Sequence, residues 1–290
     1  MKLLLKFNLI FLLVFVLGLA AASLIARGLL QKVATEEVVD RARLLMEKAN
    51  AVSTYTATQI KPLLAEQMKL AFMPQSVPAY SSAEVLLTLQ RSYPGYSFKS
   101  AMLNPTNPRD RAVAWEEDVV VQFTRNPDLK EFVGQRETPG GRSLYVARPI
   151  RISNPACLDC HSTPEAAPAT LTARYGPSNG FGWKLNETLG AQVVSVPMEV
   201  PMQRADQALA LVVSVLAAVF LFIGLALNFM LWKLVIQPVR QLSALADRVS
   251  LGEMDAPTFA AKSKDEIGVL ADSFGRMRKS LAQAMKMLEG

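Results

Sequence analysis

Two long apolar segments constrain the fold of this 290-residue chain more than any other feature. Leu3 to Ile25 and Ala208 to Ile236 consist almost wholly of apolar residues, and each is long enough to cross the hydrocarbon core of a bilayer as a helix. The chain is 51% hydrophobic with a mean hydropathy of +0.21, which fits a membrane protein with attached folded domains. We therefore expect transmembrane helices at residues 1–26 and 208–236, in contact with membrane lipid.

Basic residues at the ends of these segments predict their orientation. Lys2 and Lys6 lie at the start of the first segment, and Lys233, Arg240 and Arg248 lie at the end of the second or beyond it. Because basic residues favour the cytoplasmic side, we expect a two-pass protein of the bacterial inner membrane with both termini in the cytoplasm. Residues 27–206 then form a periplasmic domain.

The first segment has a second interpretation, as a cleaved signal peptide. Lys2 and Lys6 would form its basic region, and Ala20 to Ala22 resembles a cleavage site. An uncleaved anchor is favoured because the apolar run continues past those alanines. Either interpretation exports the residues that follow.

The exported residues include Cys157-Leu158-Asp159-Cys160-His161, the C-x-x-C-H pattern of covalent c-type haem attachment. Two thiols separated by two residues can reach the vinyl groups on one edge of a porphyrin, and the adjacent imidazole then falls under the iron. The pattern predicts one covalently bound haem c, with Cys157 and Cys160 as thioether anchors and His161 as the proximal ligand. Such haem is attached on the periplasmic side of bacterial membranes, which agrees with the predicted topology.

Three other uses of the motif are weaker. The chain has 2 cysteines and 1 histidine, so too few soft ligands remain for a zinc tetrahedron. A disulfide between Cys157 and Cys160 would close a very short loop and stabilise little. A thioredoxin-like redox pair needs a βαβ setting, which the flanking sequence does not suggest.

The pattern of apolar residues predicts helices first and strands later in the exported segment. The predicted elements are a long helix from Leu29 to about Phe72 with a kink at Pro62, a helix from Ala83 to Arg91 capped by Ser81 or Ser82, strands at Val119–Thr124, Ser143–Ile152 and Ala191–Val196, and a turn at Pro139-Gly140-Gly141. Trp115 to Phe123 is also compatible with a helix. Helices followed by a small antiparallel sheet indicate an α+β domain.

Several further motifs surround C-x-x-C-H. They are Asn104-Pro105-Thr106-Asn107-Pro108, Trp115-Glu116, Phe123, Tyr145, Arg148-Pro149, Tyr175-Gly176, Gly180-Phe181-Gly182-Trp183, Gly190-Ala191 and Val196-Pro197. Over roughly Arg27 to Arg204 this order resembles the periplasmic c-type haem sensor family with a PAS-like fold. The resemblance implies a PAS-like sheet with the haem held against it, in receptors that respond to redox state or to a small gas.

Residues near the motif are candidates for contacts with the haem. Arg148 and Arg151 carry planar donor groups suited to the propionates, and Tyr145, Tyr175 and Trp183 are candidates to line the pocket. A surface charge or a packed aromatic ring explains each of these residues equally well.

The sixth iron ligand is open. His161 is the only histidine, so a second histidine from the same chain is excluded, and the chain lacks the additional cysteine that some relatives offer. Met68, Met73 and Met102 are candidate ligands, beside an oxygen or nitrogen donor from Tyr or Lys, water or an open position. The simpler interpretation is that each methionine fills space in the core.

The C-terminal segment carries two apolar seams with the spacing of a short coiled coil. The seams are Val235, Val239, Leu242, Ala246 and Val249, then Ile267, Leu270, Phe274, Met277, Leu281, Ala284 and Leu288. Pro238 lies near the start of the first, Gly252 to Lys264 connects them, and Asp265-Glu266-Ile267-Gly268 opens the second. This arrangement over residues 235–290 resembles the HAMP signal-relay domain, and the resemblance implies a parallel four-helix bundle in a homodimer.

A pair of amphipathic helices lying on the membrane is the alternative for this segment. Narrow seams and acidic residues disfavour it, because acidic side chains are repelled by anionic headgroups. The acidic residues are Glu253, Asp265, Glu266 and Asp272.

The predicted architecture is an α+β PAS-like periplasmic domain between two transmembrane helices, followed by an all-α HAMP coiled-coil domain. We expect a haem sensor that transmits a redox or small-gas signal to a kinase, cyclase or chemotaxis-type output partner. The alternative is a membrane-anchored cytochrome that transfers electrons. A haem enzyme such as a peroxidase is the weakest alternative, since no second histidine is present to assist proton transfer. No enzyme activity is expected, because the cytoplasmic tail is short and has neither a histidine for phosphorylation nor a Gly-rich nucleotide loop. The net charge of +6 without a dense basic block gives no support to nucleic-acid binding.

Overall fold

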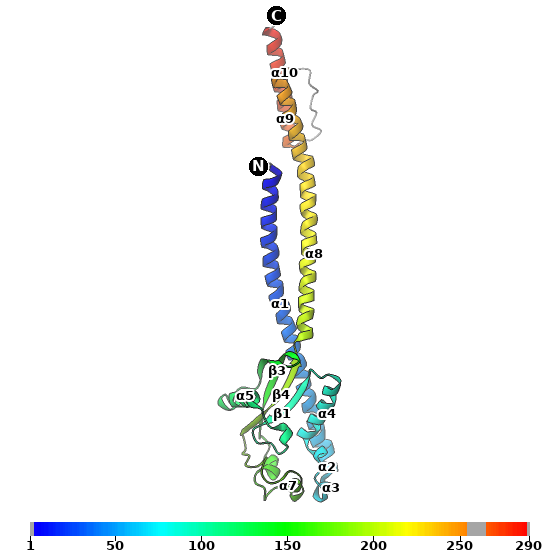
Figure 1. Ribbon diagram of the computed structural model, residues 1–290, viewed down its shortest axis with the longest axis vertical. Helices are drawn as coiled ribbons and strands as arrows, with labels where there is room; N and C mark the ends of the chain where they lie inside the picture. The colour runs from blue at the N-terminus through cyan, green and yellow to red at the C-terminus, as the bar shows by residue number, and fades with distance from the viewer. Residues whose placement is uncertain (1–2, 254–264, 289–290) are drawn as a thin grey trace. The chain divides into compact units, whose positions relative to one another are not determined.

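The computed structural model describes residues 3–253 and 265–288. The chain divides into two compact units, one of residues 26–209 and one of residues 1–25 with 210–290 (Figure 1). The first unit contains a four-stranded sheet with helices packed on it. The described part of the second unit is helical.

The sheet is antiparallel throughout and has the strand order β1-β4-β3-β2. The strands are β1 (Ser97–Met102), β2 (Phe132–Thr138), β3 (Gly141–Arg151) and β4 (Thr188–Pro197). The central strands β3 and β4 pair without a break from Ser143–Pro197 to Ile150–Gly190, and a register shift follows between Ile150 and Arg151. Residues 152–187, which connect these two strands, contain the C-x-x-C-H motif.

A helix covers each face of the sheet, because side chains along a strand alternate between its faces. One face packs against α1 (Leu3–Tyr55) and the other against α5 (Ala114–Arg125). On the α1 side the core comprises Val38, Ala42, Met46, Leu144, Val146, Val194 and Val196, and on the α5 side it comprises Val119, Val120, Phe123, Ala147, Ala191 and Val193. Each of these residues is at most 3% exposed, so β3 and β4 form the buried centre of the unit.

The predicted long helix is broken near Pro62. After α1 come a π-helical turn, η1 (Thr56–Ile60), and two short helices, α2 (Lys61–Leu63) and α3 (Ala65–Leu70). Pro62 has no N–H to donate to the carbonyl of Thr58, which is why a proline interrupts a regular helix. Helical structure nevertheless continues to Leu70, close to the predicted end.

The next helix, α4 (Pro78–Ser92), begins earlier than predicted. Its N-cap is Val77, and Pro78 occupies the first turn, where a missing N–H costs nothing. The predicted caps, Ser81 and Ser82, lie within the helix, and their hydroxyls donate to the carbonyls of Gln75 and Ala79. The prediction of a serine cap was therefore wrong.

Val119–Thr124, predicted as a strand, belongs to α5, and the alternative helical interpretation of Trp115 to Phe123 is correct. Glu116 fixes the start of this helix. Its carboxylate accepts hydrogen bonds from the N–H of Val113 at 2.9 Å and from Nζ of Lys99 at 2.7 Å. Glu116 is 4% exposed, so this buried charge is paired.

In the second unit, residues 3–25 of α1 lie beside residues 210–231 of α8 (Glu199–Leu231). The rings of Phe15 and Phe220 have centroids 5.0 Å apart. The ring of Phe11 lies so close to Gly224 that a Cβ there would be 2.8 Å from it. Both α1 and α8 are long and apolar enough to cross a membrane.

After α8 come a π-helical turn, η5 (Trp232–Ile236), and the helices α9 (Gln237–Ser250) and α10 (Glu266–Leu288). Pro238 lies in the first turn of α9. Residues 254–264, most of the predicted connector, and the side chain of Leu288 lie outside the described residues. A helical N-terminal region, a small antiparallel sheet, a second apolar helix and a helical C-terminal region confirm the predicted fold class.

Candidate functional site

The C-x-x-C-H motif forms a single helical turn. A 3-10 turn, η4 (Pro155–Cys157), leads directly into α6 (Leu158–His161), and Oδ1 of Asn154 accepts a hydrogen bond from the N–H of Ala156 at 3.0 Å. Residues three apart share one side of a helix, so Cys157 and Cys160 are presented together. Both thiols are free and half-buried, and burial raises the pKa of the Cys160 thiol.

The imidazole of His161 is held at one nitrogen and one face. Its Nδ1 lies 2.8 Å from the carbonyl oxygen of Gly180 and 3.4 Å from Oγ1 of Thr106. The ring stacks on the indole of Trp183, with centroids 3.8 Å apart and an interplanar angle of 14°. Burial lowers the pKa of His161, and the Gly180 contact opposes this shift only in part. A neutral imidazole that donates from Nδ1 to a carbonyl leaves the lone pair of Nε2 free for a metal.

The loop Gly180-Phe181-Gly182-Trp183 is tied to the helical turn that carries the histidine. The N–H of Trp183 donates to the carbonyl of His161 at 3.2 Å, and the N–H of Gly182 donates to the carbonyl of Ser162 at 2.9 Å. The loop and the imidazole therefore form one hydrogen-bonded assembly.

The Asn104–Thr106 segment braces the same loop. Oδ1 of Asn104 accepts from the N–H of Gly180 at 3.2 Å, and its Nδ2 donates to the carbonyl of Phe181 at 3.3 Å. Gly180 has a φ of +81°, and a Cβ at that position would lie 2.0 Å from Oγ1 of Thr106. Only glycine fits there. Both segments are motifs in the sequence, but Gly180, Asn104 and Thr106 were not predicted to belong to the site, and their co-occurrence with C-x-x-C-H was the available signal.

Two buried donors belong to residues that the sequence analysis proposed for the haem site. Nε of Arg151 donates to Oγ1 of Thr188 at 3.2 Å, but Nη2 of Arg151 is buried without a hydrogen-bond partner in the described part of the chain. The same is true of Nε1 of Trp183. Leaving a buried donor unpaired is costly. These donors would suit the carboxylates of a prosthetic group, while the two thiols would suit its covalent attachment and the free imidazole nitrogen would suit its metal.

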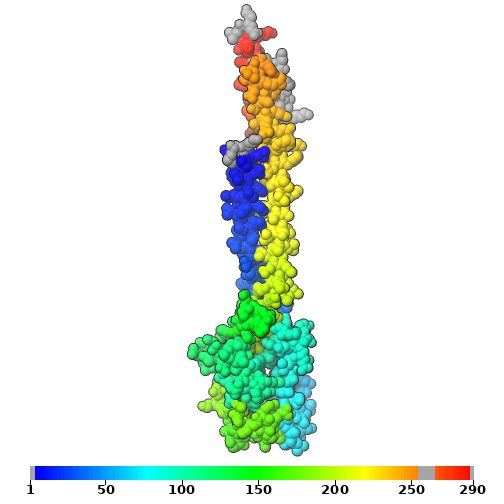
Figure 2. Space-filling view, viewed as in Figure 1, coloured from blue at the N-terminus to red at the C-terminus, as the bar shows by residue number. Residues whose placement is uncertain are grey.

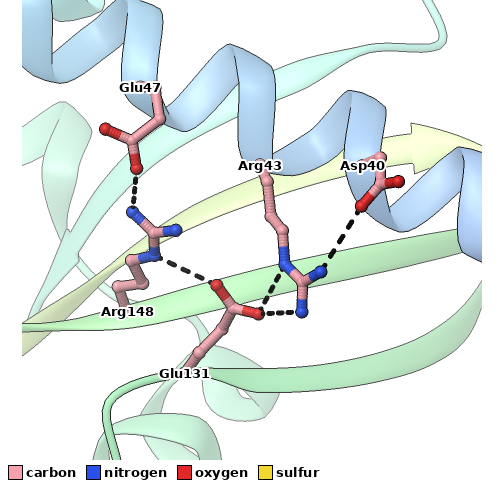
Figure 3. Close-up of polar contacts among 5 residues, drawn as sticks. All are labelled: Asp40, Arg43, Glu47, Glu131 and Arg148. Atoms are coloured by element: carbon pink, nitrogen blue, oxygen red, sulfur yellow. Dashed lines mark hydrogen bonds and ion pairs between the residues drawn. The ribbon is translucent and has the colours of Figure 1, made fainter.

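Arg148 lies in a cluster of charged residues shown in Figure 3. Its Nε contacts Glu131 at 3.1 Å, and its Nη1 contacts Glu47 of α1. Glu131 also accepts from Nη2 of Arg43 at 2.8 Å, and Arg43 reaches Asp40 at 3.4 Å. The cluster joins α1 to β3 and to the residue just before β2. Two carboxylates thus engage the Arg148 guanidinium, and its predicted contact with a propionate stays a prediction.

Met68 and Tyr175, two residues predicted to lie near the haem, are brought together by contacts between the α3 region and α7 (Ala169–Tyr175). Oγ1 of Thr170 donates to the carbonyl of Met68 at 3.2 Å, and the rings of Phe72 and Tyr175 meet edge to face with centroids 5.8 Å apart. In Figure 2 the light-blue segment of α2 and α3 lies beside the yellow-green segment at this end of the unit. Met68 and Tyr175 thus share one corner of the fold.

The sulfur of Met68 already accepts two hydrogen bonds. The N–H of Met73 lies 3.1 Å from it, and Oγ of Ser76 lies 3.2 Å from it. Met73 is half-buried beside it. The roles of both methionines as iron ligands stay predictions, and the present geometry gives the Met68 sulfur a structural role in closing the chain after α3.

Tyr145 and Met102 are used within the sheet. The ring of Tyr145 contacts Trp115 and Phe132, with centroids 5.1 and 6.1 Å apart. Met102 pairs with Gly190 across β1 and β4. Aromatic and core packing, the simpler interpretation considered for these residues, accounts for their observed contacts.

Known proteins resemble two parts of the chain. Residues 31–197 match the Tll0287-like family, and residues 230–283 match the HAMP domain. The methyl-accepting chemotaxis protein TlpA of Bacillus subtilis (strain 168) is 27% identical over 107 residues, which are 37% of this chain and 15% of that protein. The chain thus spans about 15% of the length of this curated relative. The crystal structure of the cyanobacterial heme-protein Tll0287 aligns with a TM-score of 0.43 and 17% identity, over 56% of this chain and 95% of that chain.

The chain thus combines a helix-covered antiparallel sheet with a HAMP domain, and a methyl-accepting chemotaxis protein is among the proteins similar to it. Since the family match covers more than half of its residues, the chain belongs to the Tll0287-like family. The resemblance to a haem-binding PAS-like sensor family joined to a HAMP domain is confirmed. Two helices that are candidates for membrane spans flank the sensor domain.

Proposed function

We propose that Cys157 and Cys160 attach one haem c through thioether bonds and that His161 is the proximal ligand of its iron. The observation that carries this proposal is the bond from Nδ1 of His161 to the carbonyl of Gly180, at 2.8 Å. Metal-bound histidines commonly donate their second nitrogen to a carbonyl, which fixes the tautomer and strengthens the ligand. Here the same turn that presents this imidazole also presents both free thiols.

Residues around the turn would hold the rest of the group. Nη2 of Arg151 and Nε1 of Trp183, both buried and unpaired in the described part of the chain, suit the propionates. Tyr175 would line the pocket, with Arg148 as a more distant donor. For the sixth position we retain Met73 and Met68, and Met73 is favoured because the Met68 sulfur already accepts two hydrogen bonds.

The haem supplies an iron that changes charge on reduction and can bind a small gas. His161 would pass a change at the iron to the Gly180–Trp183 loop, which is bonded to the same turn. Since this segment connects β3 to β4, a movement of the loop would reach the buried centre of the sheet. We propose that the sensor responds to redox state or to a small gas in the periplasm, and that residues 1–26 and 208–236 are its membrane anchors.

The C-terminal segment would act as the relay in a homodimer. Leu270 and Met277 of the second seam are 49% and 59% exposed in the single chain, and a partner seam would cover them. We propose residues 27–206 as the sensor and 235–290 as the relay, with both termini in the cytoplasm. A separate kinase, cyclase or chemotaxis-type partner would supply the output, with no enzymatic reaction in these residues and no nucleic-acid ligand.

The test uses the full chain, co-expressed with a c-type haem maturation system and purified in detergent. A pyridine haemochrome spectrum should report one thioether-linked haem, which Cys157→Ala with Cys160→Ala removes. Exposure of the reduced protein to CO then separates two signals. Ready CO binding supports gas sensing, and a low-spin spectrum indifferent to CO supports redox sensing. The absence of covalent haem from the wild-type chain contradicts the proposal.

A signal relay requires an intact second seam, whereas electron transfer by a membrane-anchored cytochrome does not. Leu270→Asn with Leu281→Asn preserves charge but disrupts the seam, and it should abolish haem-dependent responses of the host while leaving the haem spectrum unchanged. The matched control is Val269→Asn, because Val269 is also exposed but lies off the seam. Full responses in the seam variant would instead favour a membrane-anchored cytochrome.

A further inference from the structure

We propose that Trp183 is a positioning residue for His161, whose indole sets the plane of the imidazole and so the direction of Nε2. The proposal rests on the assignment of His161 as an iron ligand. It goes beyond that assignment because it gives Trp183 a defined effect on the ligand, in place of general pocket lining.

Hydrogen bonds alone leave one motion of the ring free. The carbonyl of Gly180 and Oγ1 of Thr106 both contact Nδ1, so they constrain the same atom. A ring held at one nitrogen can still rock about that contact, and Nε2 would then sweep through an arc. The χ2 torsion of a histidine has broad energy minima. The side chain itself therefore does not fix the plane of the ring.

The indole of Trp183 removes this motion. Its ring lies nearly parallel to the imidazole, at 14°, with centroids 3.8 Å apart, so rocking of the imidazole toward the indole would drive it into that face, and rocking away would break the stacking contact. Gly180 thus fixes the position of Nδ1, and Trp183 fixes the plane of the imidazole ring.

Trp183 can act in this way because its own backbone is tied to the histidine. Its N–H donates to the carbonyl of His161 at 3.2 Å, and the next bond along the loop joins Gly182 to Ser162 at 2.9 Å. The two rings therefore belong to one bonded unit. The indole contacts the histidine through its face, which leaves Nε1, buried without a partner in the described residues, for the propionate contact proposed above.

The experiment compares the full chain with Trp183→Leu and Trp183→Phe, each matured with haem and purified in detergent. The readouts are the midpoint potential and the ferric electron paramagnetic resonance spectrum, which reports the orientation of an axial imidazole. In Trp183→Leu we expect broadened or multiple resonances, because the ring samples several orientations. We also expect a higher midpoint potential. A rocking ring aligns Nδ1 less well with the carbonyl of Gly180, and the weaker hydrogen bond makes the imidazole a poorer donor to ferric iron. Trp183→Phe keeps an aromatic face and should bring both readouts back toward the wild-type values, although it lacks Nε1.

Trp115→Leu is the matched control, since the ring of Trp115 packs at a tilt against Tyr145, whereas the ring stacked on the histidine is that of Trp183. It should leave both readouts at their wild-type values. Should Trp183→Leu fail to mature, Trp183→Met, which keeps more side-chain volume without a planar face, is judged by the same criteria.

Two results would overturn the proposal. One is a non-aromatic variant at 183 with wild-type resonances and potential. The other is a Trp183→Phe protein that departs from wild type as far as Trp183→Leu does. A wild-type chain without covalent haem would instead refute the proposed function, so the two failures are distinguishable.

Discussion

Asn8 and Asn228 share a hydrogen bond between the two apolar helices, with Nδ2 of Asn228 2.7 Å from Oδ1 of Asn8. The same nitrogen also lies 2.9 Å from the carbonyl of Gly224 on its own helix. Polar contacts of this kind between membrane helices are worth about 0.6 kcal/mol on average. With the Phe15–Phe220 pair and the Phe11–Gly224 contact, they define one antiparallel register.

Asn228→Leu should therefore weaken the pairing of the two helices. Measured by disulfide formation between Phe15→Cys and Phe220→Cys, we expect the cross-linking yield to fall, with the paired state about three-fold less favoured. Ser214→Ala is the control, since the Ser214 hydroxyl bonds only to the carbonyl of Ala210 in the same helix among the bonds described. An equal loss in both variants would mean that the asparagine pair does not hold the register.

Glu131 should be a stabilising residue whose contribution depends on pH. Burial alone would raise the pKa of its carboxyl, but hydrogen bonds from Arg43 and Arg148 outweigh burial and hold the pKa below its ordinary value. A carboxyl with a lowered folded pKa stabilises the protein above the pKa of the unfolded state. That contribution disappears as pH falls through the folded pKa.

Glu131→Gln should lower the free energy of unfolding at pH 7 by about 1–3 kcal/mol, as measured by chemical denaturation of the full chain. The difference from wild type should shrink as the pH falls below about 4. Glu137→Gln removes an exposed partner of Arg142 and should cost less than about 0.5 kcal/mol. A pH-independent loss in Glu131→Gln would show that its charge is not what stabilises the fold.

Gly180→Ala should be more damaging than Gly176→Ala. Both glycines have positive φ, at +81° and +78°, so either substitution strains the backbone by about 1–2 kcal/mol. At Gly176 nothing lies within 4 Å of the new Cβ, whereas at Gly180 the new atom would meet Thr106 at 2.0 Å. The loss of unfolding free energy in Gly180→Ala beyond that in Gly176→Ala, measured by denaturation, reports this collision. We also expect the surroundings of His161 to be disturbed in Gly180→Ala. Equal costs for the two variants would contradict the close approach.

Asp265 should cap α10. Its Oδ1 accepts from the N–H groups of Ile267 and Gly268, both at 3.1 Å. Loss of such a cap costs about 1 kcal/mol, so hydrogen exchange at these two amides should rise about five-fold in Asp265→Ala. Asp272→Ala, at an exposed position within the helix, is the control and should leave them unchanged. Unaltered exchange in Asp265→Ala would assign the start of this helix to other contacts.

The strands that could be predicted were those rich in apolar and β-branched residues. Most of β3 and β4 was predicted from such runs, and the turn before β3 was predicted from Pro139-Gly140-Gly141. Strands β1 (Ser97–Met102) and β2 (Phe132–Thr138) were not predicted. Their sequences contain few β-branched residues, and they acquire strand structure by pairing with β4 and β3. The three valines of α5 favoured a strand locally, but the buried pair of Glu116 with Lys99 and packing on the sheet favour the helix.

The motif that defines the candidate site was evident in the sequence, but the geometry around it was not. The contact of His161 with Gly180 joins residues 19 apart, and Thr106 is 55 residues from the histidine. Periodicity reports only local neighbours. Arg148 illustrates the same limit, because its carboxylate partner Glu47 lies 101 residues away on α1.

The position of residues 152–187 between β3 and β4 governs the order of assembly. These strands share the longest ladder of the sheet, yet that ladder cannot form until the ends of the intervening segment have met, and long closures are slow. Cys157 and Cys160 lie within this segment, so its closure would also carry their thiols from an extended chain to the half-buried positions of the folded unit. Under the proposed function, the time available for haem attachment would then depend on how fast the sheet closes.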